Sequence, residues 1–268
     1  MSENNIQVFT ADTLADIFYQ TQTIPGLKIV GNCTQLCKLP EKMLSTHGIK
    51  ELSEISRNEQ YIDAGAAVTL NNLIALGENK LPKVLYKALI KTANPHVRNL
   101  ATIGGNICAA PIKGTLFAPL LALDAKIIMQ NQDRSLSIPI TKFSVVPEQY
   151  IVTKIRIPTD DWDIYEFSKI GPESKLTDTS ASYIFLAKIE NSVLTGIRIA
   201  FSGVVSFRSI SIENRMVGTR LPLEKKSISA LISEASIQFD QLCRNGDYNQ
   251  LMKEEFLRLI TYSFIKLT

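Results

Sequence analysis

Two glycine-bearing loops carry the residue types that could hold an anionic ligand. The first loop, Ile29-Val30-Gly31-Asn32-Cys33-Thr34-Gln35-Leu36, directly follows a short apolar strand. Gly31 lets backbone amides approach an anion closely, and the Thr34 hydroxyl could bind the same phosphate oxygens. In the second loop, Thr102-Ile103-Gly104-Gly105-Asn106, two glycines lie beside a hydroxyl and a side-chain amide, so we expect several exposed amide donors. A turn without a ligand is the competing interpretation of each loop.

Other chemistries find weaker support in the sequence. Neither loop matches a Walker A or a GxGxxG fingerprint, which argues against a P-loop or Rossmann nucleotide site. The chain has two histidines, His47 and His96, and neither lies beside a serine or cysteine with an orienting acid. The adjacent carboxylates of Asp160-Asp161 and Glu254-Glu255 are typical of a solvated turn and a solvated helix face. We therefore expect no hydrolytic centre.

The four cysteines are predicted to be reduced thiols rather than metal ligands. Cys33 and Cys37 lie four residues apart, but nothing nearby, His47 included, completes a four-ligand set. An intracellular chain keeps its thiols reduced. Small buried thiols are therefore the preferred interpretation of all four cysteines, Cys33, Cys37, Cys108 and Cys243. The N-terminus has no basic end followed by an apolar run, so the sequence predicts no signal peptide and a cytoplasmic protein.

The composition is that of a globular chain. Hydrophobic residues make up 45% of the 268 residues and charged residues 21%, which is inconsistent with disorder. The formal net charge of +3 is too small to indicate a nucleic-acid partner. The longest uncharged apolar stretch, Leu116 to Leu123, is eight residues, whereas a membrane-spanning helix needs about 20. We therefore expect one or two globular domains without a membrane span.

The elements that must position the two loops are predicted from hydrophobic periodicity and from cap and turn residues. In the first half we expect short strands at Ile6–Thr10, Leu27–Val30, Tyr61–Ala67 and Ala125–Met129. Helices are expected from Thr13 to Gln20, after the N-cap Thr69, from Lys83 to Thr92 and from Leu116 to Leu123. The stretch from Asn94 to Pro111, which contains the second loop, is expected to be irregular.

The second half of the chain has a different pattern. Four strands separated by turn residues are expected at Tyr150–Ile157, Trp162–Ile170, Ser180–Ile189 and Val193–Ser202, which indicates an antiparallel sheet. Two closing helices are expected at Leu223–Phe239 and Gln250–Lys266. Strands followed by helices packed on one face predict the α+β class, with two domains joined near residues 141–149.

The order of several motifs resembles one known family. These motifs are KIVGNCTQL, YIDAGAAVTLNNL, ANPHVRNLATIGGNICAAP, APLLALDAKI, YIVTKIRIP, FSKIG and GIRIAFSGV. Together they resemble the FAD-binding medium subunit of the molybdenum hydroxylases, the family of carbon-monoxide and xanthine dehydrogenases. The TIGGN block is the most specific of them, and the resemblance covers nearly the whole chain.

The resemblance implies an oxidoreductase subunit in a heteromeric complex. Residues 1–145 would form an FAD-binding domain of the vanillyl-alcohol-oxidase (PCMH) type, and residues 146–268 a C-terminal domain with an antiparallel sheet and packed helices. The FAD would take electrons from a [2Fe-2S] partner subunit, itself fed by a molybdopterin-binding subunit, and pass them to NAD or another acceptor. Residues 29–36 and 102–106 would bind FAD, and Val152 and Lys169 match positions near the flavin ring.

Two departures from the family pattern leave alternatives open. Asn32 and Cys33 replace residues that are glycine or asparagine in many members. Thr115 stands where the family has a flavin-binding aspartate, and a hydroxyl cannot supply the charge-assisted bond of a carboxylate. A scaffold subunit that binds FAD weakly or not at all is therefore a second hypothesis. A stand-alone flavin reductase is the third, although the chain shows no acid-base set for a substrate.

Overall fold

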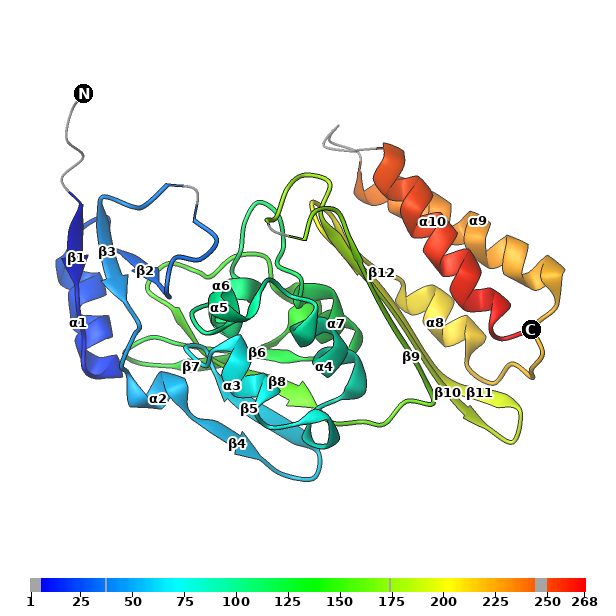
Figure 1. Ribbon diagram of the computed structural model, residues 1–268, viewed down its shortest axis with the longest axis horizontal. Coiled ribbons are helices and arrows are strands. Elements are labelled where there is room, and N and C mark those ends of the chain that lie inside the picture. Colours follow the sequence, from blue (N-terminus) through cyan, green and yellow to red (C-terminus); the bar gives the residue numbers. More distant parts are fainter. Residues whose placement is uncertain (1–5, 37, 174, 244–249) are drawn as a thin grey trace. The chain divides into compact units, whose positions relative to one another are not determined.

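The computed structural model describes residues 6–36, 38–173, 175–243 and 250–268. Figure 1 traces the chain. Its contacts divide it into two compact units. The first unit comprises Met1–Lys80, Ala93–Ala109 and Asp124–Thr159, and the second unit comprises Leu81–Thr92, Ala110–Leu123 and Asp160–Thr268. The chain therefore passes between the two units several times.

The first unit begins with a small parallel sheet. Its strands are β1 (Gln7–Phe9), β2 (Lys28–Val30) and β3 (Lys42–Ser45), in the order β1-β3-β2. Helix α1 (Leu14–Thr23) joins β1 to β2, and Thr13 and Asp16 form a capping box at its start. The next helix, α2 (Lys50–Ser53), follows β3. Ile17 and Phe18 of α1 pack with Leu44 of β3, so α1 holds the sheet and positions the end of β2.

A five-stranded antiparallel sheet forms the rest of the first unit. Its order is β4-β5-β8-β6-β7, with β4 (Ile55–Arg57), β5 (Tyr61–Gly65), β6 (Lys126–Gln130), β7 (Ser135–Pro139) and β8 (Ile151–Pro158). The register of β6 and β8 shifts: Ile128 lies opposite Lys154, and Met129 lies opposite Val152. Thr153 is thus an extra residue on β8, and such a bulge bends the strand and redirects its side chains.

Short helices lie between these strands. They are α3 (Leu70–Ile74), η1 (Glu78–Lys80), α5 (Pro95–Arg98), α6 (Ile103–Ile107) and η2 (Ile140–Lys142). The prediction of an irregular segment from Asn94 to Pro111 is wrong because two caps start helices there. The Asn94 side chain accepts from Val97 N, and the Thr102 side chain accepts from Gly105 N.

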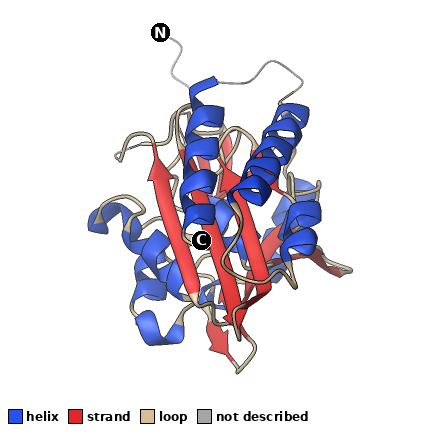
Figure 2. Cartoon of the chain, turned by 90° about the vertical axis from the view of Figure 1, so that its right-hand side faces the viewer, coloured by secondary structure: helices blue, strands red, loops and turns tan. Residues whose placement is uncertain are grey.

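The second unit is built on a four-stranded antiparallel sheet in the order β12-β11-β10-β9. Its strands are β9 (Ile164–Ile170), β10 (Ala181–Glu190), β11 (Val193–Ser202) and β12 (Ser206–Arg208). Helices α8 (Ile210–Met216), α9 (Lys225–Leu242) and α10 (Gln250–Ile265) cover one face (Figure 2). Helix α4 (Lys83–Ile90) packs on β9 and helix α7 (Phe117–Ala122) packs on β10 and β11. The predicted α+β class is confirmed.

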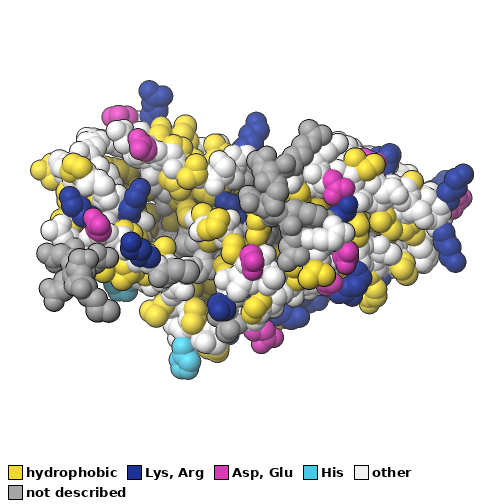
Figure 3. Space-filling view, turned by 90° about the horizontal axis from the view of Figure 1, so that it is seen from above, with side chains coloured by type: hydrophobic (Ala, Val, Ile, Leu, Met, Phe, Trp, Pro, Cys, Tyr) yellow, Lys and Arg dark blue, Asp and Glu magenta, His cyan; other side chains and the backbone are white. Residues whose placement is uncertain are grey.

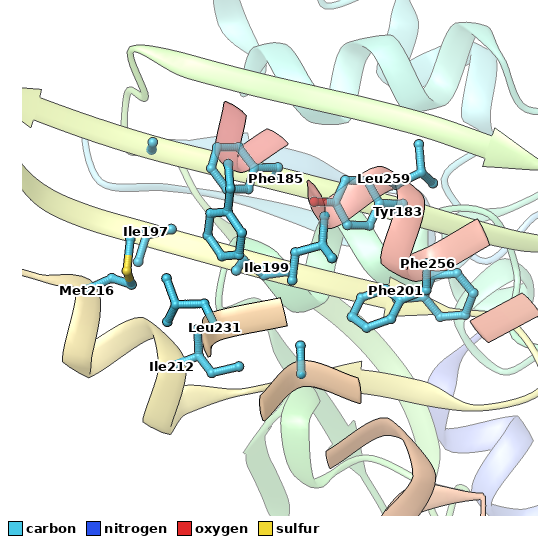
Figure 4. Close-up of a cluster of buried hydrophobic side chains, with 14 of the residues drawn as sticks. Tyr183, Phe185, Ile197, Ile199, Phe201, Ile212, Met216, Leu231, Phe256 and Leu259 are labelled. Carbon is cyan, nitrogen blue, oxygen red and sulfur yellow. The ribbon is translucent and has the colours of Figure 1, made fainter. Parts of the chain in front are cut away.

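Aromatic side chains fill the core between this sheet and α8–α10. Figure 4 shows part of this cluster, in which side chains of β10 and β11 pack with side chains of α10. Tyr183 and Phe185 come from β10, Phe201 from β11, and Phe256 and Leu259 from α10. The Phe201 and Phe256 ring centroids are 5.4 Å apart in an edge-to-face arrangement. Such pairs contribute about 0.5–1.5 kcal/mol beyond the burial of their area. The two predicted closing helices, α9 and α10, are therefore held by their apolar faces.

One strand was assigned to the wrong sheet. The strand expected at Tyr150–Ile157 is β8, which pairs with β5 and β6 and not with β9. The fourth strand of the C-terminal sheet is instead β12, which the sequence did not predict. Because strand pairing joins residues far apart in sequence, the alternation within a single strand does not reveal its neighbour. The last boundary between the two units falls at Thr159 and Asp160 rather than near residues 141–149.

The surface mixes charge types. Figure 3 shows Lys and Arg side chains interspersed with Asp, Glu and apolar side chains over the face in view. None of the helices that the structure describes is long and apolar enough to cross a membrane.

Candidate functional site

A cavity of about 510 Å³ opens in the first unit, at the level of the two glycine-bearing loops. Three segments supply most of its wall: the end of α1 with β2, the start of α6, and the segment that leads into β8. Its lining residues are Thr21, Ile24–Gly31, Thr46, Leu52, Ala66, Thr102, Gly104, Gly105, Cys108 and Val146–Val152. A volume of this size is within the range of small-molecule and cofactor sites.

The cavity brings together seven of the predicted site residues. They are Ile29, Val30, Gly31, Thr102, Gly104, Gly105 and Val152. Five predicted residues follow Gly31 but are not lining residues: Asn32, Cys33, Thr34, Gln35 and Leu36. Ile103 and Asn106 are buried residues of α6 itself. Thr115 and Lys169 belong to the second unit. The structure therefore gathers the two loops of the first unit around one space.

The backbone amides of the second loop are already occupied within the chain. Ile103 N donates to Val68 O and Gly104 N donates to Ala66 O, both at 3.0 Å. Gly105 N donates to Thr102 Oγ1 at 3.1 Å. The expectation that this loop offers several exposed amides is wrong, because helix α6 and its cap use them. At the cavity, the loop contributes the Thr102 side chain and two glycines, which have no side chain.

The two glycines of α6 have different roles, and neither has a positive φ. A Cβ atom at Gly104 would lie 2.7 Å from Ala66 O, so this glycine allows α6 to pack against the chain after β5. A Cβ atom at Gly105 would meet only Thr102 Oγ1, at 3.0 Å. Gly104 is thus required by packing, whereas Gly105 leaves space at the cavity wall.

The first loop, in contrast, has free amides. The N–H groups of residues 31–35 have no acceptor in the described part of the chain, and the next amide, Leu36 N, donates to Cys33 O at 3.4 Å. Cys33 adopts a left-handed conformation with φ 54°. Asn32 Nδ2 donates to Leu100 O at 2.8 Å, which ties the loop to the segment before α6. Successive unpaired N–H groups in a turn form a concavity that binds anions.

Apart from Val152, the third wall of the cavity, residues 146–152, was not predicted from the sequence. It includes Glu148, Gln149 and Tyr150, and Gln149 has a positive φ of 66°. The bulge at Thr153 follows, and Thr153 O accepts from Ala66 N at 3.0 Å, so β8 is tied to the strand that supports α6. A left-handed non-glycine residue beside a bulge is a signal of a functional segment, but it appears only in the structure.

Charge is sparse around the cavity. Lys28 and Glu148 are the charged residues among its lining side chains.

The two predicted site residues of the second unit are Lys169 and Thr115. Burial lowers the pKa of Lys169 from its ordinary value, although the nearby Glu173 carboxylate acts in the opposite direction. Its ammonium donates to Glu173 O at 3.1 Å. Thr115 is buried, with 6% of its surface exposed.

The thiols are less buried than expected. Cys33 and Cys243 are half-buried and Cys108 is exposed, so the interpretation of these three as buried thiols is wrong. Cys37 lies outside the described residues. Among the described residues, no group of three or more His, Cys, Asp or Glu side chains could hold a metal ion.

The arrangement suits a ligand with an anionic part and a flat apolar part. Ile29, Val30 and Val152 supply apolar side chains to the wall, and the unpaired amides begin at Gly31. A Cβ atom at Gly31 or Gly105 would fill part of this cradle. A dinucleotide such as FAD has both parts, a diphosphate and planar rings, so the residues present fit it.

Comparison with known proteins gives a consistent picture. Residues 4–160 match the family model described as FAD binding domain in molybdopterin dehydrogenase. The chain is 29% identical over 167 residues to indole-3-acetaldehyde oxidase of Zea mays, an alignment that covers 58% of this chain and 12% of the relative. It is 24% identical over 193 residues to the glyceraldehyde dehydrogenase medium chain of Sulfolobus acidocaldarius, covering 68% of each. The chain spans only 12% to 16% of the length of the first three plant relatives.

Solved structures share the fold over nearly the whole chain. A carbon monoxide dehydrogenase chain from Hydrogenophaga pseudoflava superimposes with a TM-score of 0.82 at 17% identity, covering 96% of this chain and 95% of that one. A quinoline 2-oxidoreductase chain from Pseudomonas putida 86 gives a TM-score of 0.79 at 16% identity, covering 98% and 96%. At this level of identity the likeness concerns the fold alone.

Proposed function

Because the chain belongs to the family of FAD-binding domains in molybdopterin dehydrogenases, we propose that it is the FAD-binding, electron-transferring subunit of a molybdenum-containing hydroxylase. The PCMH-type fold and the oxidoreductase class that the resemblance implied are confirmed by this membership. The observation that carries the proposal is the set of unpaired amides at residues 31–35, which begins at the cavity-lining Gly31. FAD, when bound, supplies the redox chemistry, and the chain supplies its placement.

In this proposal the first unit holds the diphosphate and the adjoining rings of FAD. The amides of residues 31–35 donate to phosphate oxygens, and the Thr34 and Thr102 hydroxyls add further bonds. Gly31 and Gly105 leave the space that the ligand occupies, and Ile29, Val30 and Val152 contact its apolar parts. These residues bind and orient the cofactor and exclude water from part of it. None of them transfers a proton.

The second unit is proposed to contribute at the flavin end. Lys169 and Thr115 are the residues assigned there, with Thr115 in the place of an aspartate. The two-domain division stays part of the proposal, with its boundary moved from residue 145 to Thr159 because β8 belongs to the first sheet.

The partners are proposed from the names of the relatives. A medium chain and an FAD-subunit are parts of larger enzymes, as the glyceraldehyde dehydrogenase medium chain and the nicotinate dehydrogenase FAD-subunit of Eubacterium barkeri are named. We propose that an iron–sulfur subunit delivers electrons from a molybdopterin-binding subunit, that the chain passes them to NAD or another acceptor, and that the complex is cytoplasmic.

Two observations favour a second candidate, a scaffold subunit with weak or absent FAD binding. Thr115 cannot supply a carboxylate, and the amides of α6 are already used within the chain. The discriminating experiment is a titration of the purified chain with FAD, followed by gel filtration and measurement of the visible flavin absorption of the protein peak. Retained stoichiometric flavin supports the electron-transferring subunit. A colourless protein that cannot be reconstituted overturns it in favour of the scaffold.

A further inference from the structure

Helix α4 of the second unit carries a row of lysines without an acidic residue. Lys83 and Lys87 are one turn apart within the helix, and Lys91, its C-cap, is one turn further. Lys83 and Lys91 are exposed and Lys87 is half-buried. With a rise of about 1.5 Å per residue, the row is about 12 Å long. Three like charges at this spacing repel one another and weaken an isolated helix.

No carboxylate in the described part of the chain forms an ion pair with any of these three ammoniums. Lys83 and Lys87 instead approach the same aromatic ring: their Nζ atoms lie 5.5 Å and 4.3 Å from the centroid of Tyr165 on β9. Cation–π attraction offsets part of the repulsion. The net positive charge of the row is left for solvent or for a partner.

Apolar groups of α4 and of the neighbouring β9 accompany the lysine row. Ile90 is 44% exposed, and Tyr86 and Tyr165 are half-buried. Lysine is depleted at the centre of permanent protein interfaces, where apolar contacts dominate. Charged surfaces with a small apolar part are more typical of transient encounters, in which complementary charge speeds association. A row about 12 Å long is also longer than a single phosphate group. Several carboxylates side by side on a protein surface could pair with all three lysines.

We propose that the α4 face, defined by Lys83, Lys87, Lys91 and Tyr165, is a docking surface for an acidic redox protein that visits the subunit transiently. The redox nature of the partner rests on the proposed function, whereas its acidic surface follows from the uncompensated lysine row. The α4 face attracts this partner through its charge and releases it as salt screens that charge.

The test is the binding of two oppositely charged probe proteins to the full chain by isothermal titration calorimetry. The soluble haem domain of cytochrome b5 is the acidic probe and cytochrome c the basic one. Wild-type chain is expected to bind cytochrome b5 at low ionic strength, to lose it as salt is added, and not to bind cytochrome c. The variant Lys83→Glu/Lys87→Glu/Lys91→Glu is expected to weaken cytochrome b5 binding about tenfold or more.

A matched control separates the α4 face from net charge. Lys188, Lys225 and Lys226 are exposed lysines of the same unit. Lys188→Glu/Lys225→Glu/Lys226→Glu changes the net charge by the same amount and is expected to keep the affinity within about twofold. The neutral variant Lys83→Gln/Lys87→Gln/Lys91→Gln is expected to be intermediate, and circular dichroism reports whether each variant is folded.

Equal affinity of the α4 variant and wild type, or equal loss in both Glu variants, overturns the proposal. The proposal is also overturned if the wild-type chain does not bind cytochrome b5 but binds phosphatidylserine vesicles or ADP through the three lysines. That result would assign the face to a membrane or a nucleotide. The FAD titration is a separate readout. If the chain does not retain FAD, the proposed function is overturned. If the α4 variant of that chain still loses cytochrome b5 binding, an acidic protein remains the partner of this face.

Discussion

Gly31 and Thr102 meet across the candidate site: a Cβ atom built on Gly31 would lie 3.1 Å from Thr102 Oγ1. Gly31 directly follows β2 of the small parallel sheet, and Thr102 caps α6, which packs on the five-stranded sheet. Thr102 Oγ1 is also the atom nearest to a Cβ on Gly105, at 3.0 Å. One hydroxyl therefore adjoins both glycines that leave space in the cavity wall.

The first prediction separates the two glycines of α6. Gly105→Ala should leave the fold stable and weaken FAD binding, because its methyl group enters the cavity and meets only the Thr102 hydroxyl. Gly104→Ala should lower the free energy of unfolding by about 1–3 kcal/mol, because its methyl group meets Ala66 O. Urea unfolding and FAD titration of both variants check this. Unchanged FAD affinity in Gly105→Ala would remove α6 from the site.

The second prediction concerns Thr115. If it stands in the place of a flavin-binding aspartate, Thr115→Asp should restore a charged acceptor and tighten FAD binding by about 1 kcal/mol, or roughly fivefold in Kd. Thr115→Asn, which adds a similar volume without charge, is the control and should change the Kd less. Fluorescence titration of the flavin measures both. Weaker binding in Thr115→Asp would show that this residue does not face the flavin.

The third prediction is a pH dependence of stability that arises from Asp63. Burial acts to raise the pKa of Asp63, but its hydrogen bonds and ion pairs with Arg156 and Lys154 outweigh burial and hold the pKa below its ordinary value. Arg156 Nε and Nη2 donate to the two carboxylate oxygens at 2.7 and 2.8 Å. A lowered folded-state pKa stabilises the fold above the unfolded value of about 3.9, and this contribution is lost as the pH falls through the folded value.

Urea unfolding of wild type and Asp63→Asn at neutral pH and near pH 3 measures this contribution. The difference in unfolding free energy between the two proteins should be largest at neutral pH and shrink in acid. A difference that stays constant with pH would contradict the assignment to the Asp63 carboxylate.

The fourth prediction concerns the isolated chain. Loaded with FAD, it should not oxidise xanthine-like or aldehyde-like substrates, because the oxidising centre is proposed to lie on another subunit. Slow oxidation of NADH with artificial dyes is expected, since flavin held by the chain would supply hydride-accepting chemistry. Turnover assays on the metal-free chain test this. Robust oxidation of an aldehyde would make a stand-alone oxidoreductase the better interpretation.

Local patterns in the sequence determined much of the secondary structure. The Thr13 and Thr69 caps, the apolar faces of α9 and α10, and the apolar runs of β10 and β11 each depend on residues close together in the chain. The motif order also located both loops and indicated the family, which the family model confirms over residues 4–160. Periodicity and capping can be predicted from the sequence because the interactions that cause them join residues within one or two turns of each other.

The tertiary structure alone decided which groups of those loops are available to a ligand. The α6 amides looked free in the sequence, but Ala66 and Val68, more than thirty residues earlier, accept from them. The pairing of β8 with β5 and β6 and the cavity wall at residues 146–152 likewise depend on distant partners. A hydrogen bond or a close approach between remote segments is set by how whole elements pack, and no local pattern records it.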